Sequence, residues 1–236
     1  MSRLRKAGKI LGRAGAGDLA ARTTFAGAPD YFSIDLEKVF ARHAPVEIEI
    51  GAGKGEFILD RARNFPDRNF LAIELSGVIA RVLAVRCGAA AVGNVRVIRM
   101  DARSLVHLML PEASIAAYHI YFPDPWPKER HEKNRLISRW FLEDCVTFLR
   151  PGAKLQVKSD YEPNCSRIAE LLDHGPEGEE LPVLPLRITG VANHVNNTGA
   201  PWPDDICTNY QRKMKERGVP VHAVEVIREP DTERGR

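Results

Sequence analysis

Val46-Glu47-Ile48-Glu49-Ile50-Gly51-Ala52-Gly53-Lys54-Gly55 joins an apolar strand pattern directly to a glycine-rich turn, and a helical pattern follows over residues 55–63. Glycines in such a turn permit positive φ and let a ligand approach the backbone closely. In an open α/β sheet, the turn after the first strand lies at the carboxyl edge, beside the position where ligands bind. The stretch therefore predicts a doubly wound sheet with a ligand at the end of its first strand.

The rest of the chain continues the alternation of strands and helices. Further strands are predicted over residues 69–74, 95–100, 116–121, 154–158, 184–189 and 219–227, and helices over 35–42, 76–91, 104–110, 136–148, 163–172 and 206–217. This order favours an α/β fold with a mostly parallel, seven-stranded sheet covered by helices on both faces. We expect one domain over residues 31–228, preceded by a basic, flexible arm over 1–30 and followed by a tail over 229–236.

Composition excludes several classes of protein. The 236 residues are 44% apolar and 28% charged, which is typical of a soluble globular protein, and no apolar run is long enough to cross a bilayer. The four cysteines, Cys87, Cys145, Cys165 and Cys207, are far apart and form no CxxC pair. We therefore expect a reducing cytoplasm, no disulfides and no metal site. The basic arm suits either phosphate contact or simple solubility.

The glycine turn has a spacing that narrows the kind of ligand. A dinucleotide fingerprint would need a glycine at position 56, which is Glu56, and a Walker loop needs four residues between its glycines. The remaining pattern, an acid followed by G-x-G-x-G, favours an adenosyl ligand without a pyrophosphate.

Acidic residues follow four successive strands of the predicted sheet: Glu49, Glu74, Asp101 and Asp124. A carboxylate at the position of Glu74 can accept hydrogen bonds from both ribose hydroxyls. Asp101 is placed to accept from an adenine amine, and Glu49 from an ammonium group. Any one of them has an ordinary explanation as a helix cap or loop end. Together they fit S-adenosylmethionine, which offers donors of all three kinds.

The stretch Tyr121-Phe122-Pro123-Asp124-Pro125-Trp126-Pro127-Lys128 ends the fourth predicted strand abruptly, because its prolines fix φ and lack backbone donors. It holds a carboxylate, an aromatic ring and an ammonium in one rigid corner, as functional loops do. For Trp126, stacking on a base and packing beneath the loop are both open.

With these motifs, the sequence resembles the bacterial tRNA (guanine-N7-)-methyltransferase family, whose fold is the Rossmann-like fold of class I S-adenosylmethionine-dependent methyltransferases. The resemblance spans roughly residues 30–220. The matching stretches are Glu49-Ile50-Gly51-Ala52-Gly53-Lys54-Gly55, Ile73-Glu74, Asp101-Ala102, Phe122-Pro123-Asp124-Pro125-Trp126-Pro127-Lys128, Arg130-His131, Lys133, Arg135-Leu136-Ile137, Leu149-Arg150-Pro151-Gly152 and Ser159-Asp160-Tyr161.

The resemblance implies roles for individual residues. Cofactor contacts are implied for Glu49, Gly51, Gly53, Glu74, Asp101 and Asp124, substrate contacts for Lys128, Asp160, Thr208 and Tyr210, and RNA contacts for Arg130, His131, Lys133 and Arg135. The family's late Thr-Lys-[Tyr/Phe]-Glu block is only half kept, as Thr208-Asn209-Tyr210-Gln211. Both charges of that block are missing, so only Thr208 and Tyr210 are carried over.

The implied reaction moves a methyl group from S-adenosylmethionine to N7 of a tRNA guanine, at position 46 in the variable loop. Guanine N7 is an exposed lone-pair acceptor that attacks without losing a proton, so no strong general base is needed. A fixed carboxylate at Asp124 or Asp160 would stabilise the positive charge that develops on the purine, and Asp124 is the candidate catalytic residue.

Two alternatives stay open from the sequence. One is an amino-group nucleic-acid methyltransferase, although those enzymes usually show Asp/Asn-Pro-Pro-aromatic, whereas a single proline separates Asp124 from Trp126 here. The other is a catalytically silent tRNA-binding protein on the same fold, suggested by the altered block over 208–211. We expect no membrane and no obligate protein partner, and a monomer and a homodimer are equally compatible with the sequence.

Overall fold

The computed structural model describes residues 34–108, 110–173, 184–194, 202 and 204–230. The arm over 1–30 and the end of the tail over 231–236 lie outside these residues. The chain divides into two compact units, Met1–Pro111 and Glu112–Arg236, and each is described separately.

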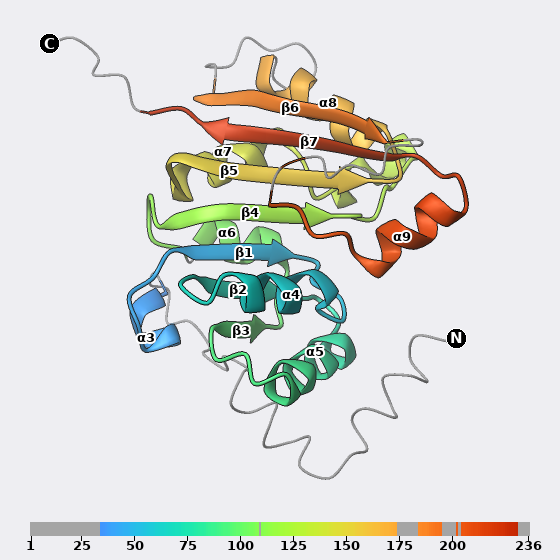
Figure 1. Cartoon of the computed structure of the whole chain (residues 1–236). Helices are drawn as coiled ribbons and strands as arrows, with labels where there is room; N and C mark the ends of the chain where they lie inside the picture. Colours follow the sequence, from blue (N-terminus) through green and yellow to red (C-terminus); the bar gives the residue numbers. More distant parts are fainter. Residues whose placement is uncertain (1–33, 109, 174–183, 195–201, 203, 231–236) are drawn as a thin grey trace, which may run out of the picture. The chain divides into compact units, whose positions relative to one another are not determined.

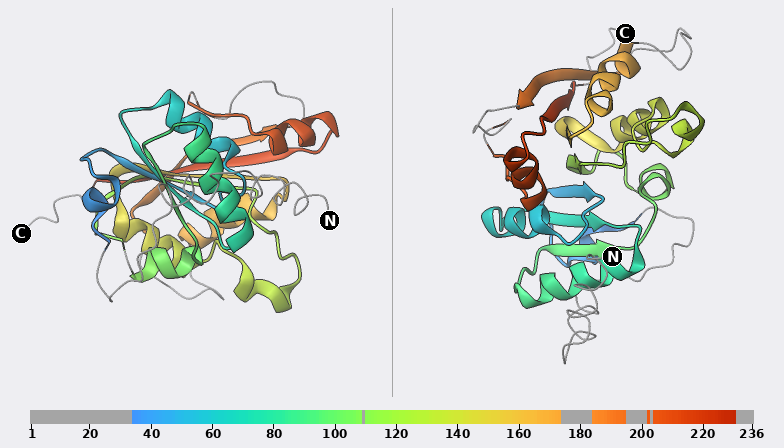
Figure 2. Two further views of the ribbon diagram at one scale, coloured as in Figure 1. Left: turned by 90° about the horizontal axis from the view of Figure 1, so that it is seen from below. Right: turned by 90° about the vertical axis from the view of Figure 1, so that its right-hand side faces the viewer.

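Unit 1 contains three parallel strands, β1 (Val46–Ile50), β2 (Asn69–Ile73) and β3 (Val95–Ile98), with β2 in the middle (Figure 1). Every residue of β1 and β2 is buried, as expected for parallel strands covered on both faces. The connecting helices are α3 (Leu36–Phe40), α4 (Glu56–Asn64), α5 (Gly77–Ala89) and α6 (Ala102–Leu108). The views in Figures 1 and 2 place α4 on one face of these strands and α6 on the other.

Unit 2 contains β4 (Ile115–Tyr121), β5 (Leu149–Ser159), β6 (Leu186–His194) and β7 (Val221–Arg228). β4 and β5 are parallel, whereas β7 runs antiparallel to both β5 and β6. Its helices are a 3₁₀ helix (Glu129–Asn134), α7 (Arg139–Phe148), α8 (Pro163–Asp173) and α9 (Asn209–Glu216). Figure 2 shows α7 and α8 on one face of these strands and α9 on the other.

The strand order is β3-β2-β1-β4-β5-β7-β6, which confirms the predicted seven-stranded, doubly wound α/β sheet. The antiparallel β7 makes the sheet mixed. The parallel part of the sheet follows from the alternation of strand and helix in the sequence up to β5, and the antiparallel part from the pairing of β7 with β5 and β6.

The clearest differences from the predictions concern two strands and one side chain. Arg150-Pro151-Gly152 was expected to precede a strand over 154–158, but β5 already begins at Leu149, because proline is tolerated at the start of a strand and Gly152 accommodates φ +77°. β6 begins later and extends further than the predicted 184–189. Trp140, which fits the helical apolar pattern of α7, is 71% exposed and does not pack in the core.

Three of the four cysteines lie in the interior. Cys87, Cys145 and Cys165 are buried, Cys207 is partly exposed, and all four are free thiols. Burial raises the pKa of Cys87 and of Cys165 to about 12, so these thiols are inert hydrophobic side chains at neutral pH. No helix in the described part of the chain combines the length and apolar character needed to cross a membrane.

Candidate active site

In unit 1, the predicted acids lie at the carboxyl ends of the three parallel strands. Glu49 is the penultimate residue of β1, Glu74 directly follows β2, and Asp101 lies three residues beyond β3. Because parallel strands end at one edge of a sheet, the topology places these acids along the same edge of unit 1. The glycine turn after β1 lies at that edge too.

The glycine turn is held open by backbone hydrogen bonds. The amides of Gly51 and Ala52 both donate to the carbonyl of Ile73, at 2.9 and 3.1 Å. Gly51 has φ +75°, and a Cβ atom added there would meet nothing within 4 Å. The space above Gly51 is therefore available to a ligand that approaches the backbone closely.

Glu74 is anchored where the resemblance requires a ribose acceptor. Its carboxylate accepts from the amide of Gly53 (3.0 Å) and from the amide of Ser76 (2.8 Å), one bond to each oxygen. Ser76 in turn caps α5 through its side chain. Two carboxylate oxygens offer about four acceptor positions. The side chain is thus oriented by the backbone while acceptor capacity remains for hydroxyl donors.

Glu49 has an unusual environment among the acids of unit 1. Its side chain is buried, with the residue 6% exposed, and its Oε2 atom has no hydrogen-bond partner among the described residues. Burial is the main cause that raises the pKa of this carboxyl well above its usual range, and repulsion from Glu74 and Glu56 adds to it. A buried acceptor without a partner is rare in folded proteins and indicates a missing donor. A cationic donor would both satisfy Oε2 and restore the charged form.

Asp101 already has a partner. Arg103 binds its carboxylate through the guanidinium, at 2.8 Å between Nη2 and Oδ2, and through its own amide, at 3.0 Å to Oδ1. The side-chain bond from Arg103 is the first cause that holds the pKa of Asp101 below its usual value. The structure therefore gives Asp101 the ordinary helix-capping role as well, and its contact with an adenine amine stays a prediction.

Gly55, the last glycine of the turn, is required by packing. It begins α4 with φ +75°, and a Cβ atom there would lie 2.1 Å from Cδ1 of the fully buried Leu83. We expect Gly55→Ala to lower the free energy of unfolding by about 2–3 kcal/mol, because it adds overpacking to left-handed backbone strain. Gly53→Ala is the matched control: its φ is +55° and its nearest neighbour would be 3.9 Å away, so only about 1 kcal/mol is expected. Urea unfolding of both variants checks this, and equal losses would contradict the packing argument.

In unit 2, Asp124 lies in the exposed proline-rich loop that follows β4. Two backbone contacts fix this loop: the amide of Phe122 donates to the carbonyl of Lys158 (2.7 Å), and Nε of Arg135 donates to the carbonyl of Trp126 (3.2 Å). Phe122 and Trp126 both have positive φ, at 55° and 39°. Non-glycine residues persist in this conformation only where the surroundings hold them, and such sites are often functional.

Trp126 is partly covered by the 3₁₀ helix that follows the loop. It is 37% exposed, and its ring lies 5.5 Å from the ring of His131, tilted by 45°. Both interpretations of Trp126, packing and stacking on a base, stay predictions.

Asp160 and Tyr210 are brought together, although 50 residues separate them. The Tyr210 hydroxyl donates to Oδ2 of Asp160 at 2.7 Å, and the Tyr210 ring lies 4.5 Å from the ring of Phe122. Thr208 caps α9, since its hydroxyl accepts from the amide of Gln211 at 3.1 Å. The structure thus gathers the end of β5, the start of α9 and the loop after β4 into one region of unit 2.

The predicted RNA-binding residues follow that loop directly. Arg130, His131 and Lys133 belong to the 3₁₀ helix Glu129–Asn134, and Arg135 follows it. Arg130 and Lys133 are exposed, and Lys128, at the N-terminal boundary of the helix, is exposed too.

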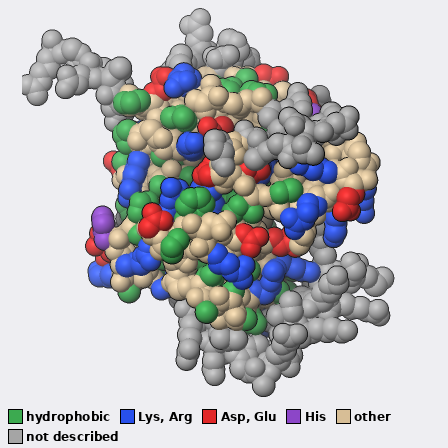
Figure 3. All heavy atoms as spheres, in the orientation of Figure 1, with side chains coloured by type: hydrophobic (Ala, Val, Ile, Leu, Met, Phe, Trp, Pro, Cys, Tyr) green, Lys and Arg blue, Asp and Glu red, His purple; other side chains and the backbone are tan. Residues whose placement is uncertain are grey.

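A second group of basic residues lies on α9. Figure 3 shows Lys and Arg side chains gathered over this helix, with Arg212 and Lys213 exposed and Met214 buried. This is the amphipathic pattern of a solvated helix.

Unit 2 contains a buried lysine that no motif in the sequence indicates. Lys158 is fully buried at the end of β5, where its ammonium bonds the carboxylate of Asp205 and, at 3.2 Å, the amide oxygen of Gln211. It also lies 4.6 Å from the centre of the Tyr121 ring and 5.3 Å from that of Trp202. Burial lowers the pKa of Lys158, and Asp205 opposes this. No local signal reveals the cluster, because Asp205 and Gln211 are 47 and 53 residues away along the chain.

The Lys158 cluster explains the altered block over 208–211. Gln211, where the family resemblance leads us to expect glutamate, is 1% exposed and faces Lys158. Asp205 already supplies the negative charge that this ammonium requires. In this chain the side chain at 211 therefore packs in the interior of unit 2 as an acceptor for Lys158.

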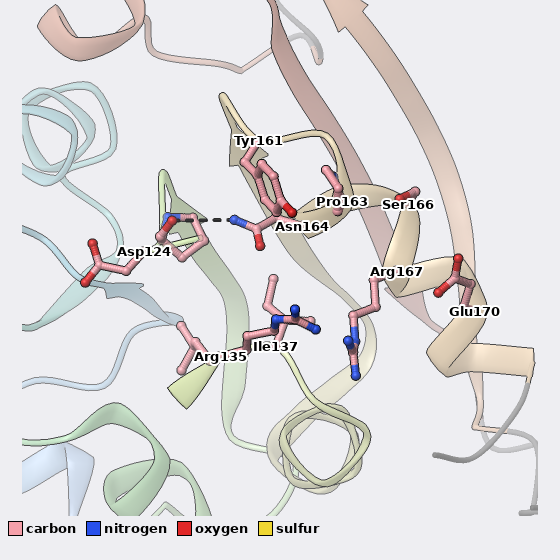
Figure 4. A pocket seen from close by; sticks show the side chains of 11 residues that line it. Asp124, Arg135, Ile137, Tyr161, Pro163, Asn164, Ser166, Arg167 and Glu170 are labelled. Carbon is pink, nitrogen blue, oxygen red and sulfur yellow. Dashed lines mark hydrogen bonds between the residues drawn. The ribbon is translucent and has the colours of Figure 1, made fainter. Parts of the chain in front are cut away.

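Unit 2 also contains a pocket of about 130 Å³ beside the proline-rich loop (Figure 4). Pro123 and Asp124 line it on one side, and Tyr161, Asn164 and residues of α8 on the other. The Asn164 amide donates to the carbonyl of Pro123 (3.5 Å) and to the hydroxyl of Ser159 (3.0 Å), which joins the two sides. The role of Asn164 could not be predicted from the sequence, because nothing in its local sequence distinguishes it from any other residue in the first turn of a helix.

Comparison with known proteins assigns the family. The profile of a family described as a putative methyltransferase matches residues 43–223. A protein of Syntrophotalea carbinolica named tRNA (guanine-N(7)-)-methyltransferase is 32% identical over 196 residues, which cover 83% of this chain and 79% of that protein. The chain belongs to the tRNA (guanine-N7-)-methyltransferase family. A second member, from Psychromonas ingrahamii, is 35% identical over 144 residues, which cover 61% of this chain and 59% of that protein.

The fold agrees with this assignment. The crystal structure of the 16S rRNA methyltransferase KamB superposes with a TM-score of 0.58 at 15% identity, covering 89% of this chain and 99% of that one. At such identity the likeness concerns the fold alone, which is that of class I S-adenosylmethionine-dependent methyltransferases. Within the described residues, no group of three or more His, Cys, Asp or Glu side chains is arranged to hold a metal ion.

Proposed function

We propose that this protein transfers a methyl group from S-adenosylmethionine to N7 of a guanine in tRNA. The observation that carries the proposal is the buried, unpartnered carboxylate oxygen of Glu49 beside an open glycine turn, in a chain whose family relatives are named for this reaction. At a strand end with a purely structural role, an apolar or fully hydrogen-bonded side chain would be expected instead.

The residues of unit 1 fit the cofactor. Glu49 would hold the ammonium of its amino-acid moiety, the turn at Gly51 and Gly53 would allow close approach, and Glu74 would accept from the ribose hydroxyls. Asp101 would accept from the adenine amine if it shares its carboxylate with Arg103. S-adenosylmethionine, when bound, supplies an electrophilic methyl on a sulfonium. The protein's part is to orient this group and to exclude water from it.

The residues of unit 2 fit the guanine. Asp124 and Asp160 are carboxylates that accept from the N1–H and amino groups of guanine, two donors that adenine does not present together. Tyr210 fixes the orientation of Asp160 through its 2.7 Å hydrogen bond. Attack by the N7 lone pair leaves positive charge on the purine, and a fixed carboxylate stabilises that charge more than it stabilises the neutral base.

The basic residues after the loop would bind the RNA backbone. Arg130, His131, Lys133 and Arg135 are the residues concerned, with Lys128 nearest the base. Phosphate contacts of this kind set the position of the RNA without reading its sequence. Selectivity for the variable-loop guanine would then come from the shape of the folded tRNA and from displacement of the target base. We place the protein in the cytoplasm, where tRNA is available, as a monomer or a homodimer.

The direct test uses the purified protein, unmodified tRNA transcript and methyl-labelled cofactor. We expect label to enter the tRNA and nucleoside analysis to identify 7-methylguanosine as the product. Label in another nucleoside would refute the site of methylation and favour an amino-group methyltransferase. Binding of tRNA without detectable cofactor binding by calorimetry would favour a catalytically silent RNA-binding protein.

Glu49 also predicts a pH dependence of cofactor binding. Its pKa is raised in the free protein, and a bound ammonium would lower it by favouring the ionised form. Binding therefore releases a proton between these two pKa values, so affinity is expected to rise with pH in that window and to level off above the pKa of the free form. Calorimetry at mildly acidic pH in two buffers of different ionisation enthalpy measures this release. Glu49→Gln should abolish the buffer dependence, and a wild-type protein without it would contradict the role of Glu49.

A further inference from the structure

Two arginines meet at the pocket beside the proline-rich loop of unit 2. Arg135 comes from the segment after the 3₁₀ helix and Arg167 from α8, and both line the pocket (Figure 4). Arg167 belongs to none of the motifs that the sequence analysis singled out. Its place at the pocket is set only by the packing of α8 within unit 2.

Both guanidinium groups are paired with the same carboxylate. Glu132 bonds Nη2 of Arg167 and lies 3.5 Å from Nη1 of Arg135, while its own side chain is 54% exposed. One carboxylate thus faces two permanent cations, which leaves one positive charge uncompensated within this triad. An exposed ion pair of this kind contributes little to stability, so Glu132 can give way to another anion at low cost.

Arg167 retains donor capacity. Its Nε atom is buried without a hydrogen-bond partner among the described residues, although the side chain as a whole is 28% exposed. A guanidinium presents its donors in a planar fork that matches two oxygens of one phosphate. A phosphate between the two arginines could engage several donors at once with different oxygens, whereas both arginines contact the same oxygen of Glu132, Oε1.

The pocket is also lined by two carboxylates, those of Asp124 and Glu170. In Figure 4 the carboxylates of Asp124 and Glu170 lie towards opposite ends of the pocket, and the two guanidinium groups lie between them. Asn164 and Tyr161 add a polar amide and an aromatic ring to the wall. Because Pro123 and Asp124 form another part of the wall, the pocket adjoins the loop that we assign to the guanine.

We propose that Arg135 and Arg167 form a subsite for a backbone phosphate of the RNA next to the methylated guanine, and that Glu132 occupies these arginines when no RNA is bound. This inference rests on the proposed function and extends it. It assigns RNA binding to Arg167 and a competing, regulatory contact to Glu132.

The experiment measures binding of an unmodified tRNA transcript to the full chain, without cofactor, over a series of salt concentrations. Arg167→Ala is expected to weaken binding about tenfold and to reduce the slope of log affinity against log salt by about one, because one phosphate contact is lost. Arg167→Lys keeps the charge but not the fork, so it should keep the slope and recover only part of the affinity. Methylation assays should show a higher KM for tRNA with kcat unchanged.

Arg187→Ala is the matched control. Arg187 also belongs to unit 2, forms an exposed ion pair with Glu229 at 3.1 Å and does not line the pocket. The two arginine variants lose the same charge, so any general electrostatic effect on tRNA is common to both. If they weaken binding equally, the phosphate subsite is refuted.

Glu132→Gln supplies a result of the opposite sign. Removing the competing carboxylate should tighten tRNA binding about threefold to tenfold at low salt, and Glu229→Gln should tighten it distinctly less. A Glu132→Gln variant that binds no more tightly than Glu229→Gln would overturn the competing role of Glu132. These outcomes are read from binding alone, so they are distinct from failure of the proposed function, in which the wild-type protein binds tRNA but forms no 7-methylguanosine. A wild-type protein that binds no tRNA would overturn both.

Discussion

Asp124→Asn is expected to slow methyl transfer to tRNA about 100-fold to 1,000-fold, as removal of one fixed electrostatic partner does in other enzymes. The substitution keeps the size of the side chain and one acceptor oxygen, but it removes the negative charge that would face the positively charged purine. Because Asp124 is exposed in a loop held by its neighbours Phe122 and Trp126, the fold should be unaffected. The loss should appear in kcat more than in the KM for tRNA, since the charge develops only during transfer.

Single-turnover assays with labelled cofactor measure this effect, and urea unfolding verifies the fold. Asp60→Asn is a suitable control, because Asp60 is an exposed acid paired with Arg63 on α4 and has no place in the proposed site. An Asp124→Asn variant that retains a rate within a few-fold of the wild type would remove Asp124 from the mechanism. In that case Asp160 would remain as the carboxylate that faces the base.

Lys158→Met is expected to lower the free energy of unfolding by about 3–5 kcal/mol, the cost of leaving a buried charge without its partner. The charge concerned is that of Asp205, whose side chain is 2% exposed and whose ion pair is with Lys158. Methionine fills much of the volume of lysine, so the loss reports the missing ammonium rather than a cavity. The contact with the Tyr121 ring is lost as well.

The control is the double variant Lys158→Met/Asp205→Leu, in which both charges are absent. Replacing a buried ion pair by apolar groups is often neutral or even stabilising, so this variant should recover most of the stability that the single variant loses. Urea unfolding of the two variants and of Asp205→Leu completes the cycle. A double variant as unstable as the sum of the two single variants would show that the charges are independent, contrary to the structure.

The Lys158 cluster contributes to the stability of unit 2 and lies next to the proposed guanine-binding residues. Through Lys158, it joins the end of β5 to Asp205 before α9 and to Gln211 within that helix. Asp160 and Tyr210, which bond one another, are close neighbours in sequence of Lys158 and Gln211. A variant that loosens the cluster should therefore weaken the contact between Asp160 and Tyr210. The buried polar group thus gives unit 2 a defined arrangement at its proposed substrate side.

Hydrophobic periodicity by itself determined the fold class. The patterns over β1 to β7 and the intervening helices are local, because each depends on residues a few positions apart, and they predicted the doubly wound, seven-stranded sheet. The strand-end positions of Glu49, Glu74, Asp101 and Asp124 could be predicted in the same way, since an acid that follows an apolar run is visible in the sequence. The proline-rich loop was visible too, because proline restricts the backbone at its own position.

Only the tertiary structure decided which of these groups already have partners. In the sequence, Glu49 and Asp101 are both acids at the end of a strand. In the structure, Glu49 is buried with one carboxylate oxygen unpaired, whereas Asp101 forms an ion pair with Arg103. The pairs Lys158–Asp205 and Arg167–Glu132 join residues 47 and 35 positions apart. No local pattern encodes such pairs, because burial and charge pairing depend on which side chains meet in space after the strands and helices have packed.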